Sequence, residues 1–200
     1  MKTSSLNIST LAFSKNQAII GLVLLAVMLM TRVDHFGSAI KLPDASLAVF
    51  FLAGLYLRQW KLFPLYLVTA GIIDYVVTHY QGTSDFCVTP AYMFLIPTYA
   101  VMWFAGRGAT AYVALRWINL ACVANWVFAG TLAAFFISNT SFYFLSGYIQ
   151  NFNLMQYVNG VVLYLPHYVG FTLVYVGLAA IIHVVAKLIV GIPEQEKAKS

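Results

Sequence analysis

The chain has little charge. Only 8% of its 200 residues are Asp, Glu, Lys or Arg, whereas the charged fraction of a soluble domain is about 25%. Hydrophobic residues make up 62% of the sequence, and the mean hydropathy is +0.83. This composition excludes a soluble domain. We therefore expect an all-α, polytopic protein that lies in a lipid bilayer.

Several functional motifs are also missing. The sequence contains no Gly-Lys dipeptide, so it has no phosphate-binding P-loop, and we expect no ATP site in this chain. The Lys and Arg residues form no basic run, which argues against nucleic acid as a partner. No internal repeat or low-complexity tract divides the chain, so a single transmembrane domain over residues 1–200 is expected.

Apolar runs set the expected topology. Six runs are long enough, or nearly so, to cross a bilayer core of roughly 30 Å, and they predict six transmembrane helices in one monomeric bundle. They lie near 17–34, 42–57, 62–80, 90–105, 109–137 and 154–188. Of the eleven Lys and Arg residues, all but Arg32 and Lys41 fall on one side of these spans. Because cytoplasmic segments carry the excess of positive charge, both termini are predicted to be cytoplasmic.

Polar residues near the predicted outer side are candidates for a site. Asp74 lies well inside the third span, where an unpaired carboxylate is costly. We expect it either to form a structural hydrogen bond within the bundle or to contact a ligand at the floor of an outward cavity. His35 follows the first span, and Tyr92 lies in the first turn of the fourth. Asp44, beside Pro43, is interpreted as a first-turn acid of the second span, without chemistry.

Cys87 lies in the polar run 80–92 between the third and fourth spans. The other cysteine, Cys122, is predicted at mid-membrane depth, so it is interpreted as packing and no disulfide is expected. A lone thiol makes a poor zinc site, because zinc takes three or four protein ligands. A metal that brings its own equatorial ligands, as in haem or a corrinoid, needs only one or two axial ligands from the protein. Cys87 can supply one of these.

The set of His35, Asp74, Cys87 and Tyr92, spread over three segments, resembles the BtuM family of bacterial cobalamin transporters. The resemblance covers essentially the whole chain. It implies a six-helix bundle similar to the S-components of energy-coupling factor transporters, lying as a multi-pass protein in the bacterial inner membrane. It also implies that base-off cobalamin or cobinamide is the substrate, with Cys87 as the axial cobalt ligand. The corrinoid pocket would include His35, Asp74 and Tyr92.

The resemblance further implies that thiolate ligation promotes loss of cyanide from cyanocobalamin. Cys87 would then act catalytically in a protein that is primarily a transporter. S-components dock an energy-coupling module through a small-xxx-small motif in the first helix, and that motif is missing here, since Leu22 stands four residues after Ala18. Dependence on this ATP-driven partner is left open. Two other functions stay open: a membrane thiol oxidoreductase using Cys87, and an S-component-like binder of another vitamin.

Overall fold

The computed structural model describes residues 15–37, 42–57, 59–80, 89–112, 117–149, 151 and 153–197, with only the backbone given for 34–37, 117 and 190–197. Every regular element within these ranges is a helix, which confirms the predicted all-α class for the described part of the chain. The elements are α1 (Lys15–Gly37), α2 (Ser46–Leu57), α3 (Leu62–Tyr80), the 3-10 helix η3 (Pro90–Phe94), α4 (Leu95–Gly108), the 3-10 helix η4 (Ala109–Tyr112), α5 (Trp117–Leu145) and α6 (Leu154–Lys197).

Within the described part of the chain, four helical segments are long and apolar enough to cross a membrane. They are Lys15–Val33, Leu62–Tyr80, Ile118–Leu145 and Leu154–Ile189. The other two α-helices are short: α2 has 12 residues and α4 has 14. At 1.5 Å per residue α2 spans only about 18 Å, less than the roughly 30 Å of a bilayer core. The predicted membrane character is therefore supported. The predicted count of six crossing helices is not confirmed, because only four of the described helices are long and apolar enough to cross.

The boundary between the fourth and fifth predicted spans is wrong. The sequence predicts spans at 90–105 and 109–137, but helical structure runs from Pro90 through η3, α4 and η4 to Tyr112. α5 then begins at Trp117 and ends at Leu145. Apolar residues continue through 109–115, so hydropathy alone does not mark where one helix ends and the next begins.

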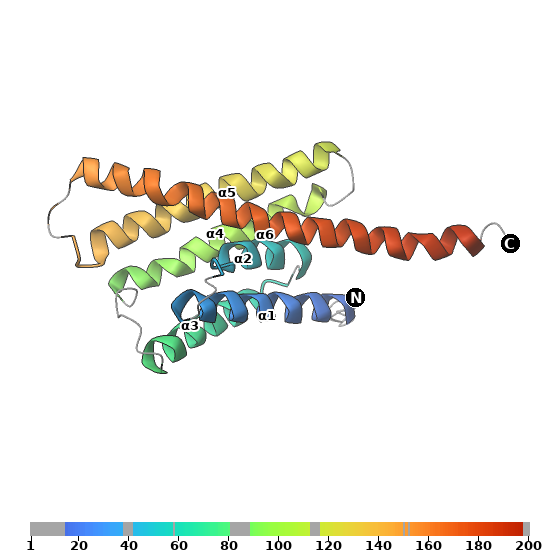
Figure 1. Ribbon diagram of the computed structural model, residues 1–200, viewed down its shortest axis with the longest axis horizontal. Coiled ribbons are helices and arrows are strands. Elements are labelled where there is room, and N and C mark those ends of the chain that lie inside the picture. The colour runs from blue at the N-terminus through green and yellow to red at the C-terminus, as the bar shows by residue number, and fades with distance from the viewer. Residues whose placement is uncertain are drawn as a thin grey trace, which may run out of the picture.

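α2 lies inside the bundle. Apart from Tyr56, all of its residues are buried, and it contacts α1, α3, α4 and α6 (Figure 1). Phe50 of α2 stacks on Tyr99 of α4 with ring centroids 4.3 Å apart, and it meets Phe63 and Tyr66 of α3 edge to face. A short helix surrounded on several sides needs no polar face, which explains its almost uniformly apolar sequence.

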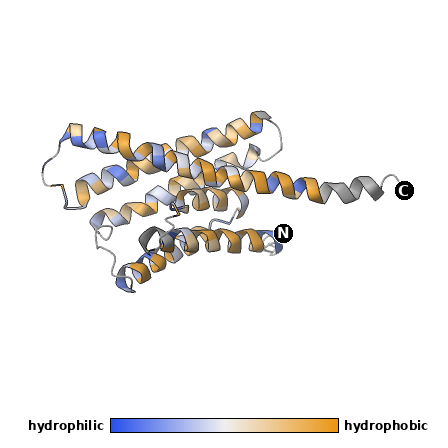
Figure 2. Ribbon diagram, viewed as in Figure 1, coloured by the Kyte–Doolittle hydropathy of each residue, from blue (hydrophilic) through white to orange (hydrophobic). Residues whose placement is uncertain are grey.

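The outside of the bundle is apolar. Figure 2 shows hydrophobic residues along most of the outer helices. α6 exposes large apolar side chains over much of its length, among them Leu163, Val174, Ile181 and Ile182, and α1 exposes Leu22. Soluble proteins rarely expose apolar surface of this extent. These faces fit contact with lipid.

The two ends of the bundle differ in charge. α1 begins and α6 ends at the same end of the bundle (Figure 1). Lys15, Lys61, Arg107 and Lys187 belong to the start of α1, the α2–α3 turn, the end of α4 and the C-terminal part of α6, all toward this end. Arg32, near the C-terminal end of α1, lies toward the opposite end. The described cations are thus concentrated where the chain termini emerge.

Two glycines bring α2 and α4 into close contact. A Cβ atom added to Gly106 would lie 2.0 Å from the carbonyl oxygen of Phe51, and one added to Gly54 would lie 2.2 Å from that of Trp103. Both neighbours are backbone atoms, which cannot move aside unless their helix moves. Glycine at these two positions therefore fixes how closely α4 approaches α2.

We expect Gly106→Ala to push α4 away from α2 and to lower the free energy of unfolding by about 1–3 kcal/mol, the usual cost of overpacking a core. Thermal unfolding of the purified protein in detergent measures the change. Gly177→Ala on α6 is the matched control, because a Cβ there meets nothing within 4 Å. Equal thermal stability of the two variants would contradict the tight α2–α4 contact.

Candidate functional site

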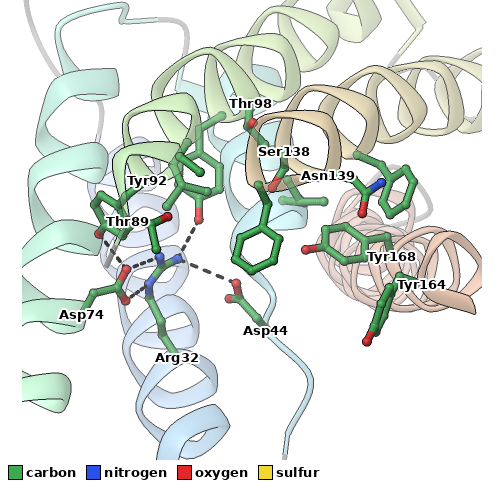
Figure 3. Close-up of a pocket in the computed structure, with 16 residues that line it drawn as sticks. Arg32, Asp44, Asp74, Thr89, Tyr92, Thr98, Ser138, Asn139, Tyr164 and Tyr168 are labelled. Carbon is green, nitrogen blue, oxygen red and sulfur yellow. Dashed lines mark hydrogen bonds and ion pairs between the residues drawn. The ribbon is translucent and has the colours of Figure 1, made fainter. Parts of the chain in front are cut away.

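A cavity of about 350 Å³ lies toward the end of the bundle opposite the chain termini. The C-terminal parts of α1, α3 and α5 meet there with the segments that begin α2, η3 and α6 (Figure 3). The cavity is lined by Arg32, Asp44, Leu47, Asp74, Thr89, Ala91, Tyr92, Leu95, Thr98, Tyr99, Phe135, Ser138, Asn139, Phe142, Tyr164 and Tyr168.

One wall is built on a buried ion pair. Arg32 donates from Nε to Oδ1 of Asp74, and from Nη2 to Oδ2 at 2.6 Å. Only 5% of Arg32 and 8% of Asp74 is exposed. Parallel bonds from one guanidinium to both carboxylate oxygens are a strong and geometrically specific contact. The carboxylate that the sequence predicts inside the bilayer thus has a countercharge within the bundle.

Three hydroxyl groups extend this ion pair into a network. Nη1 of Arg32 donates to Oγ of Ser46 at 2.6 Å and to the hydroxyl oxygen of Tyr99 at 2.8 Å. The hydroxyl of Tyr92 donates to Oδ2 of Asp74 at 2.7 Å, as the dashed lines in Figure 3 show. Side chains from α1, α2, α3, η3 and α4 therefore meet at one polar point.

Asp44 lies just before α2. Its Oδ1 accepts the backbone N–H of Ser46 at 2.9 Å and the Ser46 hydroxyl at 2.6 Å, and its Oδ2 lies 3.7 Å from Nη1 of Arg32. The interpretation of Asp44 as a first-turn acid is wrong, because α2 has no acid in its first turn. An Asp that accepts the N–H two residues ahead forms a local turn and keeps itself out of the helix. Its side chain is 36% exposed and lines the cavity.

The opposite wall is aromatic. α5 contributes Phe135 and Phe142, and α6 contributes Tyr164 and Tyr168. Figure 3 shows both tyrosines across the cavity from Arg32. Phe135 and Tyr168 pack edge to face with ring centroids 5.1 Å apart. The cavity therefore offers flat rings on one side and a charged, hydrogen-bonding surface on the other, which suits an amphipathic ligand.

Of the four residues predicted for the site, the structure describes the side chains of two, Asp74 and Tyr92. Asp74 and Tyr92 are hydrogen-bonded to each other in the cavity wall. His35 belongs to the last turn of α1, and its side chain lies outside the described part. Cys87 also lies outside the described residues, two positions before Thr89, which lines the cavity. Within the described ranges no group of three His, Cys, Asp or Glu could hold a metal ion.

Arg32 lines the cavity but is not among the site residues predicted from the sequence. The first predicted span, 17–34, contains Arg32 near its outer end, and the residue is assigned there only as an outer-side cation. In the structure α1 continues to Gly37, so Arg32 lies within the helix rather than at its end. The sequence does contain a feature that points to Arg32. Asp74 needs a partner inside the bilayer, and Arg32 is one of only two cations predicted on the same side as Asp74.

One buried polar atom in the cavity wall has no partner among the described residues. The hydroxyl oxygen of Thr89 makes no hydrogen bond with any described residue, although almost none of it is exposed. An unsatisfied buried hydroxyl usually costs about 1–3 kcal/mol. The wall of the cavity thus contains a buried hydroxyl whose hydrogen-bonding capacity the described residues leave unused.

We expect Arg32→Gln to lower the free energy of unfolding by about 3–5 kcal/mol, because it leaves the Asp74 carboxylate buried without a countercharge. Asp74→Asn should also destabilise the protein. The double variant removes both charges, so its loss should be smaller than the sum of the two single losses. Thermal unfolding in detergent supplies all three values. Additive losses would mean that the two side chains do not interact in the folded protein.

Comparison with models of known protein families and with curated proteins finds no match for this chain. Any functional assignment therefore depends on its residues and on the geometry of the cavity.

Proposed function

We propose that this protein binds a corrinoid, cobalamin or cobinamide, in the cavity and carries it across the inner membrane of a bacterium. One observation carries the proposal: Asp74 and Tyr92, two residues of the set that resembles a corrinoid pocket, are hydrogen-bonded in the wall of one cavity. Thr89, two positions after Cys87, lines the same cavity. The rings of Tyr164 and Tyr168 offer flat surfaces for a macrocycle.

The proposed arrangement in the membrane is an S-component-like bundle of six helices with the cavity facing outward. α2 and α4 are too short to cross alone, but α2 is enclosed by its neighbours and needs no length to match the lipid. Its short length also leaves space over its N-terminal end, where the cavity lies. The cations Lys15, Lys61 and Arg107 at the other end support cytoplasmic termini.

Cys87 is the proposed axial ligand of cobalt in the base-off corrinoid. A thiolate is a soft, strongly donating ligand, so it should weaken the bond between cobalt and the group on the other face of the ring. When that group is cyanide, it leaves as the anion with its bonding electrons while sulfur occupies the opposite axial position. The protein would then modify cyanocobalamin as well as carry it.

The described cavity is smaller than a whole corrinoid. Its volume of about 350 Å³ is near the lower end of the range for drug-sized ligands, and a corrin ring with its amide side chains is larger than such a ligand. The proposal therefore requires that only one edge of the ring enters, or that the cavity widens. A second crevice of about 190 Å³ between α3 and α4 is lined by Tyr92 and Tyr99, which also line the cavity.

A binder of a smaller vitamin is the second candidate, and the cavity volume favours it. The volume of about 350 Å³ between the charged wall and the aromatic wall lies within the range of small-ligand sites, and such a ligand needs no thiol. A thiol oxidoreductase that pairs Cys87 with Cys122 has less support. Cys122 lies about 24 Å along the axis of α5 from Ser138, which lines the cavity.

Purified protein incubated with cyanocobalamin or cobinamide should retain the ligand through gel filtration and show its visible absorption. Cys87→Ser should shift the absorption bands and slow the release of cyanide, because oxygen is a weaker donor to cobalt than sulfur. Cys122→Ser is the matched control and should behave like the wild type. A wild type that binds no corrinoid would refute the proposal. If Cys87→Ser releases cyanide at the wild-type rate, Cys87 does not drive the release, and only that part of the proposal is refuted.

The proposed orientation is tested by labelling Cys87 in a Cys122→Ser background with a thiol reagent that does not cross membranes. Intact cells should be labelled in the absence of ligand, and added corrinoid should slow the labelling. Reaction only in inverted vesicles would reverse the proposed topology and move the site to the cytoplasmic side.

A further inference from the structure

The charges in the cavity wall do not balance. Among the described side chains that line the cavity, the cation Arg32 stands against two carboxylates, Asp44 and Asp74. Arg32 makes two hydrogen bonds to Asp74, whereas its ion pair with Asp44 is longer, with Nη1 and Oδ2 3.7 Å apart, beyond hydrogen-bonding distance. The described wall therefore carries a net negative charge, and that charge is centred on Asp44.

Asp44 also has an oxygen available to a ligand. Its Oδ1 accepts both hydrogen bonds from Ser46, whereas Oδ2 accepts none from the described part of the chain. By contrast, the two oxygens of Asp74 accept three bonds, two from Arg32 and one from Tyr92. The exposed fraction of the side chain is 36% for Asp44 and 11% for Asp74. Asp44 is thus the carboxylate with free acceptor capacity.

The segment that carries Asp44 is held by its neighbours. The hydroxyl of Tyr175 on α6 donates to the carbonyl oxygen of Pro43 at 2.7 Å. The backbone N–H of Ala45 donates to Oγ1 of Thr31 on α1 at 3.3 Å. The carboxylate is therefore positioned before a ligand arrives, which reduces the ordering cost of binding.

We propose that Asp44 contacts the ligand and makes the cavity select primary amides over carboxylates. An amide N–H that donates to Oδ2 would form a charge-assisted hydrogen bond. A carboxylate in the same place would meet a like charge in a partly buried site, which disfavours binding. The inference rests on the proposed corrinoid function, because corrinoids carry primary amides around the ring, and it names the residue that distinguishes those amides from their hydrolysed forms.

The test compares cyanocobalamin with its monocarboxylic acids, in each of which one peripheral amide is hydrolysed to a carboxylate. The affinity of the wild type for at least one of these acids should be lower than for cyanocobalamin by roughly tenfold or more, because like charges would be brought together. Asp44→Asn removes the charge but keeps an oxygen that can accept from Ser46. In this variant the preference for the amide form should fall to about twofold or less, since the like-charge penalty is gone.

Gln59→Lys is the matched control for net charge. It raises the charge of the protein by one, as Asp44→Asn does, but beyond the far end of α2, which is about 18 Å long. Because the interaction between charges falls with distance, a charge added there acts on the ligand much more weakly than Asp44 does, so the preference of the wild type should persist. Asp44→Ser, which keeps an acceptor for the turn before α2, replaces Asp44→Asn if the latter folds poorly.

The outcomes separate the two proposals. A wild type that binds cyanocobalamin and every monocarboxylic acid with equal affinity overturns the role of Asp44 and leaves the corrinoid function standing. Retention of the full preference in Asp44→Asn also overturns it. A wild type that binds none of these corrinoids refutes the function and the inference together.

Discussion

The ion pair between Arg32 and Asp74 is the contact on which the cavity end of the bundle depends. Apolar packing between helices tolerates small sliding movements, whereas a two-pronged contact between a guanidinium and a carboxylate fixes distance and orientation together. The pair joins α1 to α3, and the same guanidinium reaches α2 through Ser46 and α4 through Tyr99. Breaking a buried pair is costly even where forming it adds little net stability. One side chain therefore sets the register of four helices at this end.

The cavity forms beside this contact because of how α2 and α4 are built. At the end nearer the termini, Gly54 and Gly106 allow the two backbones to touch. Closer to the cavity, the stacked rings of Phe50 and Tyr99 take the place of the glycines. α2 begins only at Ser46, so this helix does not extend into the space above it. The polar network thus lies at the floor of an opening, where its outer groups can be reached.

Hydropathy predicts the helical class and the membrane character, and it places the third helix at 62–80, where charge and polar residues bound the apolar run. It fails between α4 and α5 because residues 109–115 are as apolar as the helices they separate. The nearness of Asp74 and Tyr92 is suggested by the short connection between their helices. The partnership of Arg32 with Asp74 is a contact across 42 residues of sequence, which periodicity does not report. Only the cost of an unpaired acid in the bilayer points to it.

The different roles of Asp74 and Asp44 follow from the groups that each carboxylate contacts. A ligand that drew Asp74 away from Arg32 would leave a buried guanidinium without its countercharge, and that loss exceeds what one new hydrogen bond returns. Binding should therefore leave the ion pair in place. Asp44 is bound to Arg32 less tightly, because its Oδ2 lies 3.7 Å from Nη1 and accepts no hydrogen bond from the described part of the chain, and its side chain lines the cavity. The ion pair that joins α1 to α3 is then different from the carboxylate proposed to bind the ligand, so the ligand can bind and leave without breaking that pair.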